Sequence, residues 1–158
     1  QYNASGTVVK VKTVHQHELY NPETYDFDYS ILELQTCLTF DSTIKPIKLP
    51  KEGLSVKAGV KCKVSGFGYD ESGSISPFLK ATVVTVIDQV ACMSDYKTHA
   101  VNFDITPQML CAGVLKSAKP SENEDSCTGD SGGSLVCNGI LEGSVSVGYD
   151  CGLAKYPG

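Results

Sequence analysis

The side chains best suited to chemistry lie in one stretch of ten residues, Asp125–Ser134. Ser131 offers a hydroxyl nucleophile, and its small neighbours leave room for a bulky substrate. Gly129 can turn its backbone N–H toward the same side as the N–H of Ser131, and two such donors can bind the oxyanion of an acyl-transfer intermediate. Asp130 lies in the middle of this turn and needs a cationic partner if it is buried. The stretch therefore predicts nucleophilic acyl transfer at Ser131.

The alternative interpretation of this stretch is an ordinary surface turn, because Gly, Ser and Asp are also common loop residues. Three features weigh against it. A further glycine follows at Gly133, Cys127 stands four residues before Ser131, and strand-forming residues come after Ser134. We therefore favour the catalytic interpretation.

Length and composition limit the class of protein. The 158 residues are 41% hydrophobic and 20% charged, with a formal charge of −5. This length allows one domain with a real core, or two small ones, and the composition excludes a disordered tail. No basic stripe is available to meet nucleic-acid phosphates, and no apolar run is long enough to span a membrane. The chain lacks both an initial Met and a signal peptide, so we expect it to be processed or incomplete at its start.

Seven cysteines are spread widely and irregularly along the chain. No two of them are separated by two residues, which argues against a zinc ribbon. The spacing suits disulfides and an oxidising compartment, and the glycosylation sequon at Asn3 also supports secretion. Because seven is odd, one cysteine should be left over.

The elements that must position these residues are mostly β-strands. Strands are predicted within Thr7–Val14, Ile31–Leu34, Lys61–Ser65, Leu79–Ile87, Ser134–Cys137 and Ile140–Val147. Alternation in the first strand places Val9 and Val11 on a buried face. Asn138-Gly139 between the last two strands is a strong hairpin signal.

Helix is scarce, and one short helix is predicted over Asp88–Thr98 with Asp88 as its N-cap. The two prolines of Lys45–Pro50 indicate an extended connector between two halves. Short strands with many turns predict an all-β sandwich or barrel.

The sequence resembles a known family, the trypsin-like serine proteases of the chymotrypsin fold. The resemblance covers nearly the whole chain and rests on Asp28–Leu34, Lys45–Pro50, Val64–Gly68, Met109–Gly113, Asp125–Ser134 and Val145–Cys151. Phe67 and Val147 stand where the family usually has Trp. The segment Tyr25–Asp28 is most similar to arthropod trypsins, mite digestive proteases among them.

The resemblance implies a chymotrypsin-like double six-stranded Greek-key β-barrel. The chain would hold it incompletely, with the first barrel truncated and the C-terminal helix missing. Residues 1–44 would be the remainder of the N-terminal barrel with the triad aspartate, and 45–58 the connector. Residues 59–158 would be the C-terminal barrel with the nucleophile and the primary specificity pocket.

By resemblance, Asp28 is the triad carboxylate that orients a histidine, with Asp26 as a rival two residues away. Ser131 is the nucleophile, and the N–H groups of Gly129 and Ser131 form the oxyanion hole. The catalytic histidine is assigned to none of those present, because His15, His17 and His99 all lack the family's Ala-Ala-His-Cys context.

Specificity is implied by Asp125, six residues before Ser131, which would form the base of a pocket for Lys or Arg. The alternative is that Asp125 simply ends the acidic run 122–125. Further substrate-binding positions carried over from the family are Ser126, Ser146, Gly148 and Gly158, the glycines leaving the pocket open.

Asp130 would pair with the activated amino terminus of the family, which this chain lacks. We therefore expect the loop around Asp130 to be disordered in the chain as given. The family pattern pairs Cys62 with Cys137, Cys92 with Cys111 and Cys127 with Cys151. Cys37 is left as a free, semi-buried thiol or pairs with a missing segment. No metal or other cofactor is implied.

The predicted function is that of a secreted trypsin-like serine endopeptidase, made as a zymogen, that cleaves after Lys or Arg through an acyl-enzyme. The 158 residues themselves should be inactive. Expected partners are protein or peptide substrates and protein protease inhibitors, with no nucleic acid and no membrane, and the protein should be a monomer. The alternative is a catalytically inactive homologue that acts as a binding protein, an allergen or another antigen.

Overall fold

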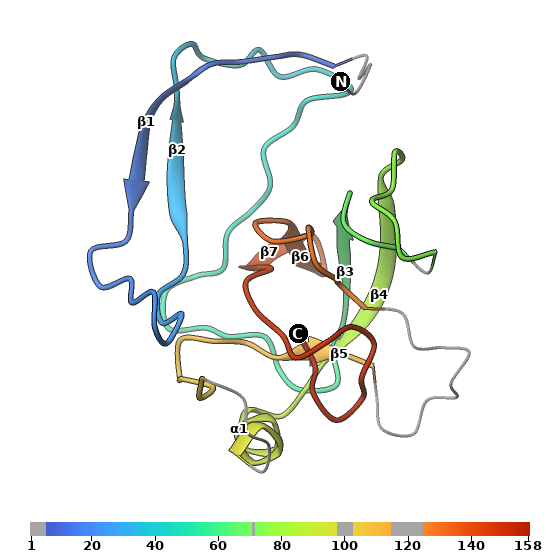
Figure 1. Ribbon diagram of the computed structural model, residues 1–158. Coiled ribbons are helices and arrows are strands. Elements are labelled where there is room, and N and C mark those ends of the chain that lie inside the picture. The colour runs from blue at the N-terminus through green and yellow to red at the C-terminus, as the bar shows by residue number, and fades with distance from the viewer. Residues whose placement is uncertain (1–5, 71, 98–102, 115–124) are drawn as a thin grey trace.

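The computed structural model of the chain describes residues 6–70, 72–97, 103–114 and 125–158. Within them the elements run in the order β1 (Val11–Gln16), β2 (Ser30–Leu34), β3 (Lys61–Gly66), β4 (Lys80–Val86), α1 (Gln89–Lys97), β5 (Ala112–Gly113), β6 (Ser134–Cys137) and β7 (Ile140–Ser144). β1 and β2 form a separate two-stranded ribbon, and the other strands form one five-stranded sheet (Figure 1). The predicted all-β class is confirmed.

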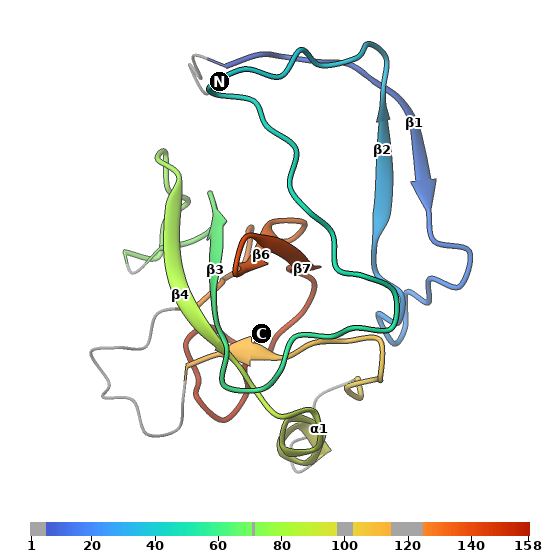
Figure 2. The ribbon, with the colours of Figure 1, turned by 180° about the vertical axis from the view of Figure 1, so that it is seen from behind.

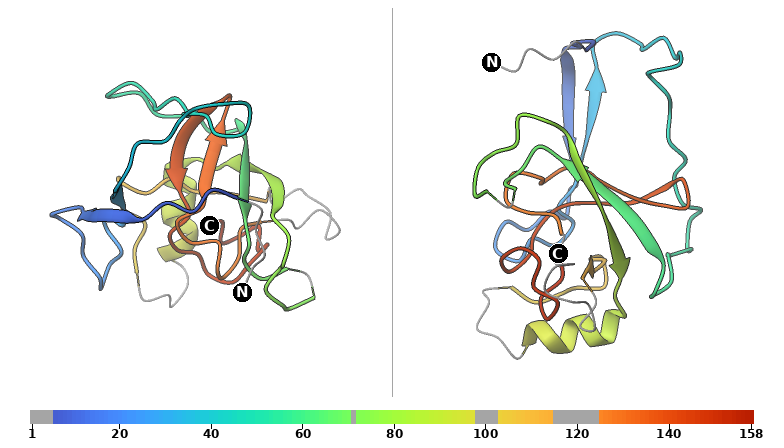
Figure 3. Two further views of the ribbon diagram at one scale, coloured as in Figure 1. Left: turned by 90° about the horizontal axis from the view of Figure 1, so that it is seen from above. Right: turned by 90° about the vertical axis from the view of Figure 1, so that its right-hand side faces the viewer.

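The five-stranded sheet has the order β5-β4-β3-β6-β7, and all its neighbours are antiparallel. Its long strands β3 and β4 twist strongly (Figure 3). Alternate residues of β3 point inward, so that Cys62 and Val64 are buried together with Val84 and Leu135. Cys62 faces Cys137 directly in the register of β3 and β6, and a disulfide joins them.

The hairpin between β6 and β7 follows the predicted turn. Asn138 and Gly139 have φ values of 52° and 78°. A two-residue hairpin loop of this type needs the left-handed region at both positions, and Asn and Gly are the residues that tolerate it. The turn places β7 beside β6, where its far end leads toward Val145 and Ser146.

Helix α1 starts as predicted, because the Asp88 carboxylate accepts a hydrogen bond of 3.0 Å from the Ala91 N–H. This contact satisfies one of the free donors at the helix start. The helix buries Cys92 and Tyr96 against Ile105, Cys111 and Tyr156, which form a second apolar cluster. The predicted disulfide between Cys92 and Cys111 ties the helix to the segment before β5.

The ribbon departs from the sequence prediction. Its first strand, predicted within Thr7–Val14, runs over Val11–Gln16, and Val11 is exposed instead of lying on a buried face. Val14, Ile31 and Leu32 are exposed as well. Two paired strands have no second layer to cover an apolar face, and alternation alone does not supply one.

The connector between ribbon and sheet runs along β7, where the Leu141 N–H donates to the Lys48 carbonyl at 2.9 Å. Figure 2 shows this long connection from behind. The division of the chain at 44 and 58 stays a prediction. In the described part of the chain, no helix is long and apolar enough to cross a bilayer.

Candidate active site

The nucleophile loop, defined as Asp125–Gly133, leads directly into β6. The Cys127–Cys151 disulfide holds its first half, with 5.2 Å between the two Cα atoms. In its second half the Gly132 N–H donates to the Val145 carbonyl at 2.7 Å, and the Val145 N–H donates back to the loop at 2.9 Å. The partners in these contacts, Val145 and Cys151, lie in the segment that follows β7.

Asp130 fixes the middle of the loop. Its carboxylate accepts hydrogen bonds from the backbone N–H of Gly68 at 2.7 Å and of Cys127 at 2.9 Å. The carboxylate lies so close to Gly66 and Gly68 that a Cβ on Gly68 would come within 2.7 Å of Asp130 Cγ. Asp130 is half-buried here, and backbone donors take the place expected for a cation. Disorder of the loop in the chain as given stays a prediction.

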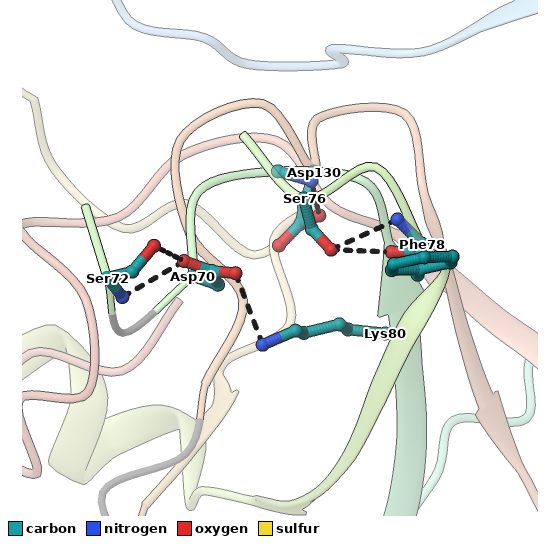
Figure 4. A network of polar contacts seen from close by, with 7 residues as sticks. Asp70, Ser72, Ser76, Phe78, Lys80 and Asp130 are labelled. Carbon is teal, nitrogen blue, oxygen red and sulfur yellow. Dashed lines mark hydrogen bonds and ion pairs between the residues drawn. The ribbon is translucent and has the colours of Figure 1, made fainter. Parts of the chain in front are cut away.

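The turn that supplies Gly68 is held by a polar network of its own (Figure 4). Ser72 Oγ donates to Asp70 Oδ1 at 2.5 Å, and Lys80 Nζ lies 3.2 Å from Asp70 Oδ2. The bonds from Ser72, with the weaker influence of Lys80, lower the pKa of Asp70 to about 2. The Asp70 carboxylate stays ionised at neutral pH and keeps this turn in place.

Ser131 is exposed, and the loop leaves two backbone donors beside it unused. In the residues that the structure describes, neither the N–H of Gly129 nor that of Ser131 donates to another group of the chain. Gly129 has a φ of 94°, a backbone conformation that residues with a Cβ strongly disfavour. A Cβ there would also lie 3.1 Å from the Cα of Gly68, so the position requires glycine.

Asp28 lies in the loop between β1 and β2, and Ser146 Oγ donates to its Oδ2 at 2.6 Å. These residues are 118 apart in the sequence, so the bond joins the ribbon to the sheet. The rival carboxylate Asp26 is bonded elsewhere, to Thr106 Oγ1 at 2.6 Å. Only Asp28 of the pair lines the cavity described below. Ser146, predicted to bind substrate, contacts the Asp28 carboxylate.

Asp125 is a largely enclosed carboxylate at the start of the nucleophile loop. Burial raises its pKa to about 6, although backbone N–H groups of Ser126, Gly152 and Gly158 partly offset the effect. In the described part of the chain no cationic side chain forms an ion pair with it. A Cβ on Gly158 would lie 3.1 Å from Ser126 Oγ and 3.9 Å from Asp125 Oδ1, so that glycine leaves the approach open.

Two cavities with a common wall bring these residues together. One, of about 530 Å³, is lined by Gly129, Ser131 and Gly148, and the other, of about 340 Å³, by Asp28 and Asp125. The wall that they share includes Ser126, Val145, Ser146, Val147 and Gly158. The arrangement can hold a cationic group at Asp125 while an acyl group lies at Ser131.

The two histidines that the structure describes do not complete this site. His15 Nε2 lies 3.3 Å from Glu33 on the ribbon, and His17 stacks on Phe27 with 4.7 Å between the ring centres. His99 lies outside the described residues, as do Asn3 and the acidic run before Asp125. Within the described ranges no hydrogen bond connects Asp28 with Ser131.

Tyr96 is a site residue that the sequence interpretation missed. It lies within the predicted helix Asp88–Thr98, and its buried hydroxyl donates to the Pro157 carbonyl at 2.7 Å and accepts from the Tyr149 N–H at 3.3 Å. It thereby holds Tyr149, which follows Gly148, and Pro157, which precedes Gly158. The signal available was that a buried Tyr hydroxyl usually finds polar partners. The seventh cysteine, Cys37, is free and exposed, not semi-buried.

Comparison with known proteins agrees with this geometry. The family model described as "Trypsin" matches residues 1–158. The chain is 38% identical over 159 residues to trypsin 5G1 of Aedes aegypti and 37% identical over 161 residues to trypsin Blo t 3 of Blomia tropicalis. All of the chain takes part in both matches, but it spans only 57% and 58% of those relatives. The solved structure of neuropsin, a serine protease expressed in the limbic system of mouse brain, superposes with a TM-score of 0.80 at 34% identity. That match covers 94% of this chain and 64% of neuropsin.

Proposed function

Because the chain belongs to the trypsin family, we propose that this protein is a serine endopeptidase. It cleaves peptide bonds after Lys or Arg through an acyl-enzyme. The proposal rests on the family, on the form of the nucleophile loop and on the charge in the adjoining cavity. Secretion and control by protein protease inhibitors belong to the same proposal.

The reaction follows the acyl-transfer mechanism of the family. Ser131 Oγ attacks the carbonyl carbon of the scissile bond while a histidine, not assigned within residues 1–158, takes its proton. The N–H groups of Gly129 and Ser131 then hold the oxyanion, which is worth about 3 kcal/mol per donor. The proton passes to the leaving amine, and water later attacks the ester carbon and releases the acid. Asp28 keeps the histidine in the correct tautomer.

Selection of Lys or Arg is assigned to Asp125. A carboxylate without a cation in an enclosed site is costly, and a cationic side chain entering the cavity relieves that cost through a charge-assisted hydrogen bond. Gly148 and Gly158 face each other closely, since a Cβ on Gly148 would lie 3.3 Å from the Gly158 Cα. Side chains at these positions would narrow the entrance.

One observation carries the proposal. Among the described residues, Ser131 stands on a loop whose Gly129 and Ser131 N–H groups have no acceptor, and the same loop begins with an enclosed carboxylate that has no cationic partner. A surface turn has no reason to combine the two features. Acyl transfer beside a cation-binding pocket uses both of them.

The test uses the full-length, activated protein and a serine-directed phosphonylating reagent. We expect Ser131 to be labelled and arginine esters to be cleaved far faster than leucine esters. Ser131→Ala should lower turnover by several orders of magnitude, whereas Ser55→Ala, at an exposed serine of the connector, should leave it unchanged. Absence of labelling in a folded sample would instead favour the inactive binding homologue.

A further inference from the structure

The segment that carries Asp28 has an unfavourable backbone. Tyr25 and Phe27 have φ values of 58° and 53°, in the left-handed region that residues with a Cβ rarely occupy. Two such residues in three positions persist only where surrounding contacts hold them. Phe27 stacks on His17 within the same loop, so the contacts that hold the segment to the rest of the molecule must come from elsewhere.

Asp26, between these two residues, supplies such a contact. Thr106 Oγ1 donates to Asp26 Oδ1 at 2.6 Å across 80 residues of sequence, at a partly buried position. Figures 1 and 2 both show the loop between β1 and β2 meeting the segment that leads into β5. Asp26 and Asp28 are thus each bound by a hydroxyl group from the other half of the molecule.

Thr106 is itself held firmly. Its carbonyl accepts hydrogen bonds from Gln89 Nε2 at 2.9 Å and from the Met109 N–H at 3.1 Å. Ile105, the residue before it, is buried in the apolar cluster that contains the Cys92–Cys111 disulfide. The hydroxyl that meets Asp26 is therefore anchored to helix α1 and to a covalent crosslink.

We propose that Asp26 and Thr106 are positioning residues for the reaction. Their hydrogen bond holds the strained segment Tyr25–Phe27 and thereby fixes the Asp28 carboxylate that follows it. This inference rests on the proposed function. With Thr106 in place, Asp28 is fixed by two bonds, its own bond to Ser146 and the bond of Asp26, two residues earlier, to Thr106. Without that bond, the left-handed residues are free to relax, and Asp28 moves relative to Ser131.

The test is Thr106→Val, which keeps the shape of the side chain and removes the donor, in the full-length activated protein. The substrate is a blocked single-residue arginine amide, the smallest substrate that offers a cation to Asp125 and an acyl group to Ser131. A small displacement of a catalytic group is enough to lower kcat by about tenfold. KM should stay within about twofold, because the backbone N–H groups of Ser126, Gly152 and Gly158 still hold the Asp125 carboxylate in place. Titration of Ser131 with the phosphonylating reagent gives the rate per folded site.

Two further variants separate positioning from folding. Thr106→Ser restores the hydroxyl and should restore kcat, and Asp26→Asn, which keeps an acceptor oxygen but loses the charge, should give an intermediate kcat. Thr43→Val is the matched control, because Thr43 Oγ1 donates to Asp41 at 2.8 Å in an exposed turn away from the site.

Unchanged kcat in both Thr106→Val and Asp26→Asn, or a loss that Thr106→Ser does not repair, would overturn the inference. An inactive wild-type protein would instead overturn the proposed function.

Discussion

The nucleophile loop and the segment Tyr25–Asp28 meet at the same pair of cavities, yet they are held there in different ways. The loop is fixed by a disulfide, by backbone hydrogen bonds to Val145 and by a carboxylate packed on glycines. The segment is fixed by side-chain hydroxyls and aromatic rings, and its backbone is strained.

This difference decides what each region tolerates. Backbone contacts and a crosslink keep their geometry whatever the neighbouring side chains are, but they demand glycine wherever the chain approaches closely. Side-chain contacts leave the backbone free to vary but fail when a single hydroxyl is removed. The nucleophile loop should therefore be sensitive to substitutions that add atoms, and the segment Tyr25–Asp28 to substitutions that remove a hydroxyl group or a ring.

The largest effect should come from adding a methyl group beneath the loop. In Gly68→Ala the new Cβ would lie 2.7 Å from Asp130 Cγ and 2.8 Å from the Asp130 N atom. Since backbone cannot yield easily, Asp130 must move and the oxyanion donors with it, and we expect kcat/KM to fall by about a hundredfold or more.

Steady-state kinetics with an arginine ester measures this loss, and Gly6→Ala, which meets nothing within 4 Å, is the control. Full activity in Gly68→Ala would show that the loop is not held by this packing.

An intermediate effect should appear in the pH dependence of stability. Burial raises the pKa of Asp125 to about 6, above its value in the unfolded chain, so its contribution to stability is present at low pH and is lost as pH rises through 6. Relative to wild type, Asp125→Asn should therefore gain about 2 kcal/mol of unfolding free energy between pH 4.5 and pH 8. Denaturant unfolding at both pH values measures the change.

Asp70 provides the opposite case for the same experiment. Its pKa is lowered to about 2, so its contribution is present above the unfolded value and is lost only as pH falls through 2. Asp70→Asn should be less stable than wild type, by the same amount at pH 5 and pH 8. A relative gain by Asp70→Asn over that range, or none by Asp125→Asn, would contradict this assignment.

The smallest effect concerns the aromatic contact of the strained segment. Tyr25 meets Phe103 edge to face, with 5.8 Å between the ring centres. A double-mutant cycle of Tyr25→Leu and Phe103→Leu should give a coupling of about 1 kcal/mol in unfolding free energy. A coupling indistinguishable from zero would leave the two hydroxyl–carboxylate bonds as the main contacts of the segment.

Local patterns predicted the part of the molecule that local contacts hold. The Asn138-Gly139 hairpin, the Asp88 N-cap and the strand within Lys61–Ser65 follow from residues a few positions apart, and they are confirmed. The three disulfides came from the resemblance to a family and are confirmed too.

Contacts between distant residues were not predictable in this way. Nothing in the sequence near Asp26 points to a threonine 80 positions later, and nothing in α1 shows that Tyr96 reaches Pro157. The exposed face of the ribbon was mispredicted for the same reason, since alternation indicates that a side is apolar but not what covers it. Local sequence patterns determine turns, caps and strands, whereas the contact partners of a residue depend on the topology of the whole chain.

The glycines around Asp130 have a consequence for how this sequence can change over time. Gly66, Gly68 and Gly133 all leave space that the Asp130 residue occupies, so four positions share one small volume. A larger side chain at any one of them would collide with residues at the other positions, whatever its effect on activity. Even Glu at position 130 would add a methylene with no place to go. We therefore expect that a substitution at one of the four positions is tolerated only together with a change at another. Neutral substitutions should accumulate at the surrounding positions instead.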